Sequence, residues 1–81
     1  MTNKQKYDQV FIEVFEIDQS VLEKDLEYDT IETWDSIGHM SMIAELEDAF
    51  DIMMETDDIL EFGSYRKGFE ILKKYSVEIE D

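Results

Sequence analysis

The chain has 81 residues, with 22 acidic and 7 basic side chains, a formal net charge of -15 and no cysteine. This length suits a single domain over residues 1–81 with one apolar core, and the lack of cysteine excludes disulfides and Cys-based zinc sites as sources of stability. The negative charge excludes nucleic acid and anionic membranes as partners and favours a monomer. Because the chain shows neither an apolar leader nor a run of about 20 apolar residues, we expect a cytoplasmic protein.

The first predicted element is a helix over residues 3–16. Its apolar residues recur at the spacing of one helix face and are Tyr7, Val10, Phe11 and Val14. A connection over residues 18–35 follows, which is too long for an ordinary loop unless it is anchored. The residues spaced to anchor it are Val21, Leu22, Leu26, Tyr28 and Ile31. We therefore expect the connection to lie against the helices.

A second long helix is predicted to begin at Asp35 or Ser36, because either side chain can accept hydrogen bonds from the free N–H groups of a helix start. It runs to about residue 51. A short helix over residues 56–61 is predicted from a Thr56 cap followed by two acids, which favour a helix N-terminus.

The last predicted helix follows a Ser64 cap. Its apolar face consists of Tyr65, Phe69, Leu72 and Tyr75. The acidic tail over about residues 77–81 is expected to fray. Since no segment alternates with period two, the predicted fold class is all-α, with three main helices, one short helix and a long first loop.

The helix over residues 36–51 has two different faces at about 100° per residue. One arc has the width of a core stripe and carries His39, Met42, Ile43, Leu46, Ala49 and Phe50. The opposite arc mixes apolar and acidic residues, namely Ile37, Met40, Ser41, Ala44, Glu47, Asp48 and Asp51. An apolar patch rimmed by one sign of charge is typical of a surface that docks partners with a basic rim. In the alternative interpretation, Ile37 and Met40 pack under the long connection.

Ser36 stands at the N-terminal end of this second arc. It is either a plain N-cap or the carrier of a phosphodiester, whose charge the helix N-terminus stabilises. A catalytic pair with His39 is disfavoured because the two residues lie about 60° apart on the helix and no second histidine exists. We interpret His39 as a core or boundary histidine and Trp34 as a plug for the connection. Gly38 costs about 1 kcal/mol inside a helix, which indicates a close approach, for instance by a partner or a bound arm.

The segment Asp35-Ser36-Ile37 resembles the Asp-Ser-Leu signature of phosphopantetheine-dependent carrier proteins. Residues 45–52, Glu-Leu-Glu-Asp-Ala-Phe-Asp-Ile, look like the run that ends the second helix in that family, and the length, helix order, long first loop and acidic balance also fit. The resemblance implies a four-helix acyl-carrier-type bundle. In it, Ser36 receives 4'-phosphopantetheine from coenzyme A, and the thiol of this arm holds an acyl or aminoacyl group as a thioester. Such a chain is no enzyme, but a substrate and partner of enzymes.

The resemblance also implies roles for the neighbours of Ser36. Asp35 would help a phosphopantetheinyl transferase to recognise the serine, and residues 56–61 would flank the arm. The docking surface would consist of Ile37, Met40, Ala44, Glu47 and Asp48. Further partners would be an acyl- or aminoacyl-loading ligase and a downstream acyltransferase or synthase. The pattern Trp34-Asp35-Ser36-x-Gly38-His39 looks more like discrete carriers of dedicated pathways, such as polysaccharide, polyketide or nonribosomal peptide synthesis, than like fatty-acid carriers.

Other kinds of function remain to be weighed. The alternative is an unmodified acidic protein-interaction module, which predicts no covalent adduct at Ser36. A calcium-binding loop starting at Asp51 is excluded, because it would need Gly in place of Thr56 and Glu in place of Phe62. We expect neither a metal site nor a catalytic residue, since the chain offers one His, no Cys and no obvious acid–base pair.

Overall fold

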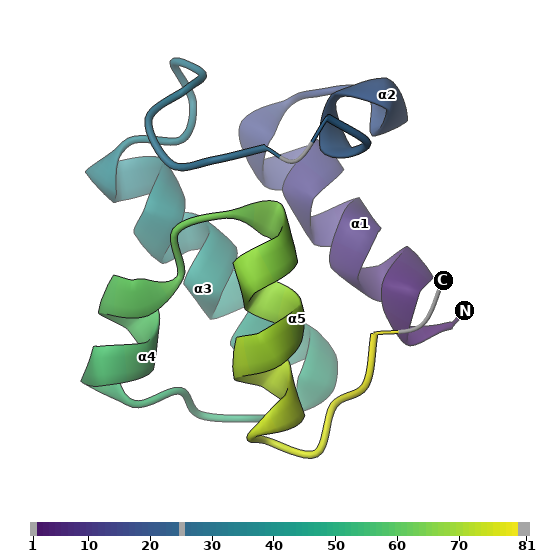
Figure 1. Ribbon diagram of the computed structural model, residues 1–81, viewed down its shortest axis with the longest axis vertical. Coiled ribbons are helices and arrows are strands. Elements are labelled where there is room, and N and C mark those ends of the chain that lie inside the picture. Colours follow the sequence, from purple (N-terminus) through teal and green to yellow (C-terminus); the bar gives the residue numbers. More distant parts are fainter. Residues whose placement is uncertain (1, 25, 80–81) are drawn as a thin grey trace.

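The computed structural model describes residues 2–24 and 26–79. In these residues the chain forms five helices and no named strand, so the predicted all-α class is confirmed. The helices are α1 (Asn3–Phe15), α2 (Gln19–Leu22), α3 (Ser36–Phe50), α4 (Thr56–Glu61) and α5 (Tyr65–Lys73) (Figure 1). No helix among them is long and apolar enough to cross a membrane.

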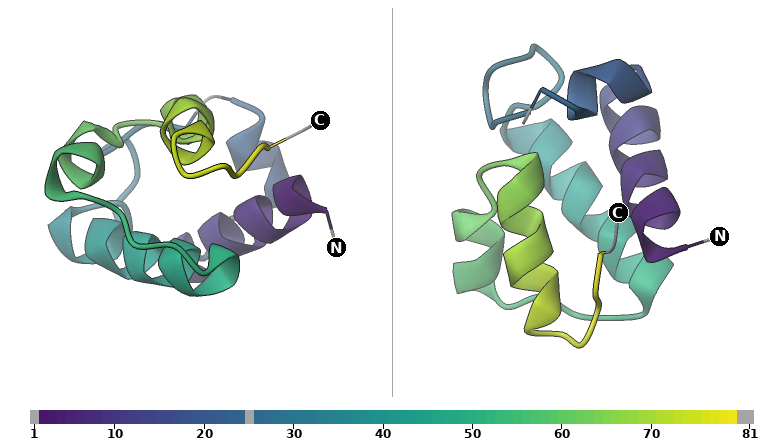
Figure 2. Two further views of the ribbon diagram at one scale, coloured as in Figure 1. Left: turned by 90° about the horizontal axis from the view of Figure 1, so that it is seen from below. Right: turned by 45° about the vertical axis from the view of Figure 1, so that its right-hand side comes forward.

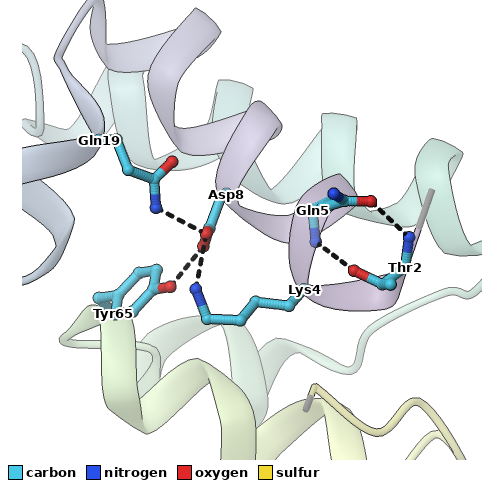
Figure 3. Close-up of polar contacts among 6 residues, drawn as sticks. All are labelled: Thr2, Lys4, Gln5, Asp8, Gln19 and Tyr65. Atoms are coloured by element: carbon cyan, nitrogen blue, oxygen red, sulfur yellow. Dashed lines mark hydrogen bonds and ion pairs between the residues drawn. The ribbon is translucent and has the colours of Figure 1, made fainter. Parts of the chain in front are cut away.

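α1 begins with a reciprocal cap that the sequence analysis did not assign. The Gln5 backbone N–H donates to Thr2 Oγ1 (3.1 Å), and the Thr2 backbone N–H donates to Gln5 Oε1 (2.9 Å) (Figure 3). The helix ends before Glu16, which adopts the left-handed conformation (φ 54°) of a helix terminus.

The long connection contains a helical turn, α2, that was not predicted. The predicted anchors Leu22 and Leu26 are buried, whereas Tyr28 remains 39% exposed. The backbone adds an anchor that the sequence pattern does not show, because the Tyr65 N–H donates to the Leu26 carbonyl (2.7 Å) and the Tyr28 N–H to the Gly63 carbonyl (2.9 Å). The connection therefore lies against the start of α5, as expected.

The core lies among α1, α3 and α5 and is rich in aromatic rings. α1 and α3 run side by side in opposite directions, with α5 across them (Figures 1 and 2). Phe11 lies at the centre of this core. The centroid of its ring lies 4.8 to 6.3 Å from the ring centroids of Tyr7, Phe15, Trp34, Phe62 and Tyr65. These three helices therefore supply most of the buried apolar residues that stabilise the fold.

The two C-terminal helices differ in how they begin. Ser64 caps α5 as predicted, since its Oγ accepts the Lys67 N–H (3.0 Å). The predicted Thr56 cap is wrong: Thr56 is already helical, Glu55 is the N-cap residue, and no side chain caps α4. A six-residue helix without a cap depends on its tertiary contacts.

The predicted fraying of the tail is not seen in residues 77–79. Val77 is buried and its N–H donates to the Leu72 carbonyl (3.0 Å). Asn3 Nδ2 donates to the Glu78 carbonyl (3.0 Å), so the segment after α5 returns to the start of α1. Residues 80–81 of the predicted tail lie outside the described residues.

Candidate functional site

The start of α3 is capped by Asp35, not by Ser36. Asp35 is extended, and its Oδ1 accepts the Gly38 N–H at 2.8 Å. Ser36 is the first helical residue and is exposed, and no hydrogen bond among the described residues uses its hydroxyl. The capping explanation of Ser36 is therefore wrong, and its hydroxyl faces solvent at the N-terminus of a 15-residue helix.

Gly38 is required by the chain's own backbone. A Cβ at this position would lie 1.9 Å from the carbonyl oxygen of Thr33, far inside contact distance. Thr33 is held in place because its Oγ1 donates to the carbonyl of Phe15 at the end of α1 (2.8 Å). The close approach expected at Gly38 is thus made by the connection itself, which fixes the turn that presents Ser36.

Trp34 and His39 form the inner side of this turn. Trp34 is fully buried, stacked on Phe15 with ring centroids 5.0 Å apart, which confirms its role as a plug. His39 is half-buried, as a boundary histidine should be, and its Nδ1 accepts the Trp34 indole N–H (2.9 Å). Its Nε2 lies 2.8 Å from the Ile59 carbonyl oxygen. One imidazole therefore joins the connection, α3 and α4.

The two faces of α3 are arranged as the sequence predicts. On the core arc Met42, Ile43 and Leu46 are buried, and the other members, His39, Ala49 and Phe50, are partly buried. On the opposite arc Ile37 is 77% and Met40 is 52% exposed. The alternative in which these two residues pack under the connection is therefore wrong.

The acidic members of this arc differ from each other. Ala44 and Asp48 are exposed, but Glu47 is half-buried, and its Oε2 accepts the Met54 N–H at 2.8 Å. Glu47 thus holds the segment between α3 and α4, a structural role that helical spacing could not indicate. The predicted docking residues Ile37, Met40, Ala44 and Asp48 are all accessible and form what we call the α3 face.

α4 and the segment before it also expose apolar side chains. Leu60 is 78% exposed and directly follows Ile59, whose carbonyl contacts His39. Met53, in the segment leading into α4, is 84% exposed. Exposed apolar side chains therefore occur on α3, on α4 and on the segment between them. All of them lie within residues 25–65, which contain acidic residues but no Lys or Arg.

A buried carboxylate ties α4 to the end of α5. Asp58 Oδ1 accepts a hydrogen bond from Lys74 Nζ (2.7 Å) and Oδ2 accepts one from the Tyr75 hydroxyl (2.5 Å). The bond from Lys74, followed by that from Tyr75, lowers the pKa of Asp58, and the same bond raises the pKa of Lys74. The Tyr75 hydroxyl in turn accepts the Glu55 N–H (2.9 Å), so it fixes the residue that precedes α4.

A second buried carboxylate, Asp8, lies among α1, α2 and α5. It accepts hydrogen bonds from Lys4 Nζ (2.9 Å), Gln19 Nε2 (2.9 Å) and the Tyr65 hydroxyl (Figure 3). Burial raises the pKa of Asp8, but these three bonds outweigh burial, so the pKa lies below its ordinary value. These bonds occupy both carboxylate oxygens and join three helices, which indicates a structural role.

Neither the groove at the start of α1 nor a metal cluster coincides with Ser36. This groove opens between the start of α1 and the segment after α5, and its polar walls include Lys4 and Gln19, which both donate to Asp8. Within residues 2–24 and 26–79, no group of three His, Asp or Glu side chains is arranged to hold a metal ion. Comparisons with protein-family models, curated proteins and solved structures gave no significant match.

Proposed function

We propose that this chain is an acyl carrier protein of four-helix bundle type that carries 4'-phosphopantetheine on Ser36. The observation that carries the proposal is the exposed Ser36 hydroxyl at the first position of a 15-residue helix whose cap is supplied by its neighbour Asp35. Because the serine neither caps its helix nor bonds to another described residue, its hydroxyl is accessible to a modifying enzyme. The resemblance of the surrounding sequence to carrier proteins indicates which modification this is.

The position of Ser36 suits a phosphodiester. The N–H groups and dipole at the start of α3 favour a negative charge. In the modification, Ser36 Oγ bonds to the phosphorus of the phosphopantetheine group of coenzyme A, and adenosine 3',5'-bisphosphate leaves. The serine proton passes to a base of the transferase, so the carrier itself needs no catalytic group. The terminal thiol of the arm then holds an acyl or aminoacyl group as a thioester.

The α3 face supports a docking role beside Ser36. Ile37 and Met40 follow the serine within the first two turns, and Asp48 adds negative charge farther along. We assign this face to a phosphopantetheinyl transferase, a loading ligase and a downstream acyltransferase or synthase, each with a basic rim around an apolar contact. In the same proposal, Asp35 contributes to recognition by the transferase and α4 flanks the arm.

Intact-mass measurement tests the proposal. The protein is incubated with coenzyme A and a broad-specificity phosphopantetheinyl transferase, and we expect the addition of one phosphopantetheine group. Ser36→Ala should abolish the addition with no loss of helical content, because Asp35 still caps α3. Ser41→Ala, which removes another exposed hydroxyl from the same helix, is the matched control and should be modified normally.

The competing function is an unmodified acidic interaction module. The exposed Ile37 and Leu60 on acidic elements would serve it equally well. Absence of any adduct with several transferases would decide for this module and against the carrier. An adduct that persists in Ser36→Ala would also contradict the proposal, because it would place the modification elsewhere.

A further inference from the structure

We propose that His39 is a pH-responsive clasp that joins Trp34 and α4 while its imidazole is neutral and releases α4 when it is protonated. We refer to Trp34, His39 and the Ile59 carbonyl as the His39 clasp. The proposal concerns the fold and holds whether or not Ser36 carries an arm.

The bonding partners of His39 fix its state. The Trp34 indole N–H can only donate, and it lies 2.9 Å from His39 Nδ1. The Ile59 carbonyl can only accept, and it lies 2.8 Å from His39 Nε2. Both contacts are satisfied together only by the neutral imidazole with its proton on Nε2. Protonation would add a proton to Nδ1, so that two donors would face each other.

Burial decides which partner moves. Trp34 is completely buried, with its ring stacked on Phe15 and 5.5 Å from the ring of Phe11. His39 is only half-buried and stands at the surface of the same cluster. The imidazolium is therefore the ring that turns toward water, where its charge is hydrated. When it turns, it also leaves the Ile59 carbonyl.

No other charged group among the described residues holds His39 in place. The connection presents Trp34 and the ring of Tyr28, whose centroid lies 5.6 Å from the imidazole. α4 presents the Ile59 carbonyl, and the residue after α4 presents the ring of Phe62 at 6.2 Å. Within residues 2–24 and 26–79, no ion pair or hydrogen bond joins a carboxylate or an ammonium group to the imidazole.

Loss of the clasp would act on α4 more than on the rest of the fold. α4 has six residues and no side-chain cap. Its other polar ties are the bonds of Asp58 to Lys74 and Tyr75 and the bond of the Glu55 N–H to the Tyr75 hydroxyl, all at the C-terminal end of α5. Without the His39 bond, α4 is held by these ties and by the partial burial of Ile59. Protonation of one ring beside the Ser36 turn would thus loosen the helix that borders it.

Nuclear magnetic resonance can test the clasp in the unmodified protein. The chain has one tryptophan and one histidine, so the indole and imidazole signals are each unique. In a titration from pH 8 to 5.5, we expect the Nε2–H tautomer at the upper end. As His39 becomes protonated, the Trp34 indole signal should shift. The indole proton should exchange with water about fivefold faster, because one hydrogen bond is lost. The backbone amides of α4 should lose their protection from exchange, while those of α5 should keep it.

Two results would overturn the clasp. One is an Nδ1–H tautomer at pH 8. The other is titration of His39 with no change at the Trp34 indole or in α4. His39→Gln is the matched control, since its amide can accept and donate but does not titrate, and it should remove the pH response. Should that variant fail to fold, the tautomer and the titration of the native protein still decide.

Discussion

Asp8 and Asp58 are two buried carboxylates with similar partners in different surroundings. Each accepts hydrogen bonds from a lysine and a tyrosine. Asp8 lies on the 13-residue α1, beside the aromatic core. Asp58 lies on the six-residue α4, which has no side-chain cap and exposes Leu60.

The comparison shows that the region around Asp8 and the region around α4 are stabilised in different ways. Around Asp8, the polar bonds add to an interface that apolar packing already holds, because Tyr7 and Phe11 are fully buried there. α4 itself contributes only the partly buried Ile59 to the apolar core, and polar bonds of Asp58 and His39 also hold it. Elements with few buried apolar contacts open at low free-energy cost, so we expect α4 to open more readily than α1.

The largest expected difference between the two regions comes from truncating one apolar side chain in each. Phe11→Ala removes a fully buried ring from the core and should cost about 3–5 kcal/mol in free energy of unfolding. Leu60→Ala removes a side chain that is 78% exposed and should change stability by less than about 0.5 kcal/mol. Urea denaturation followed by circular dichroism measures both. Equal losses would show that α4 is part of the core.

Two glycines provide a second contrast. At Gly68, a Cβ would lie 2.0 Å from the Tyr7 hydroxyl oxygen and 2.4 Å from the ring of Phe62. Gly68→Ala should therefore cost about 1–3 kcal/mol through overpacking between α1 and α5. Gly63→Ala is the control, because its nearest neighbour would be 3.7 Å away. Thermal melts that show no difference between the variants would contradict the tight packing of this interface.

Asp8→Asn sharpens the comparison through its pH dependence. The lowered pKa means that Asp8 contributes stability above its unfolded value of 3.8, and that this contribution is lost as the pH falls through the folded pKa. We expect the variant to lose about 1 kcal/mol at pH 7 and the gap to the native protein to close below pH 3.8. Tm values measured from pH 7 to 2.5 follow this gap. A gap that stays constant would mean that the charge of Asp8 does not matter.

The long helices could be predicted from the sequence because each has a periodic apolar face. α2 could not, since four residues span about one turn and show no period. The cap of α4 was also misplaced, because its N-terminus is stabilised by Tyr75, which lies 20 residues away from Glu55. Local sequence patterns hold no information about such a contact.

The candidate site was predictable to a similar extent. The exposed arc of α3 followed from the spacing of Ile37 and Met40, and the structure agrees. The choice between Asp35 and Ser36 as the cap depends on backbone geometry at the end of the connection, which the sequence does not specify. The bond from the Met54 N–H to Glu47 arises where the chain turns between α3 and α4, so it was equally hidden.

Asp58→Asn should loosen α4 without unfolding the domain. The variant removes the charge that pairs with Lys74, and it weakens the contact to Tyr75. Hydrogen exchange should become faster in residues 56–61, while residues 3–15 stay protected, because the core of α1 is untouched. The overall Tm should fall less than in Asp8→Asn. Faster exchange in both helices would show that the two regions unfold together.

The smallest effect on stability is expected for Asp48→Lys, which changes only the α3 face. Asp48 is exposed and bonds to no other described residue, so the Tm of the variant should stay the same. The rate of modification by a phosphopantetheinyl transferase at low salt should nevertheless fall several-fold, because electrostatic complementarity mainly affects the association rate. Glu47→Lys is the instructive contrast. It also breaks the bond from the Met54 N–H, so it should lower the Tm as well as the rate. If Asp48→Lys is modified at the native rate at low salt, the charge of Asp48 does not guide the transferase to the α3 face.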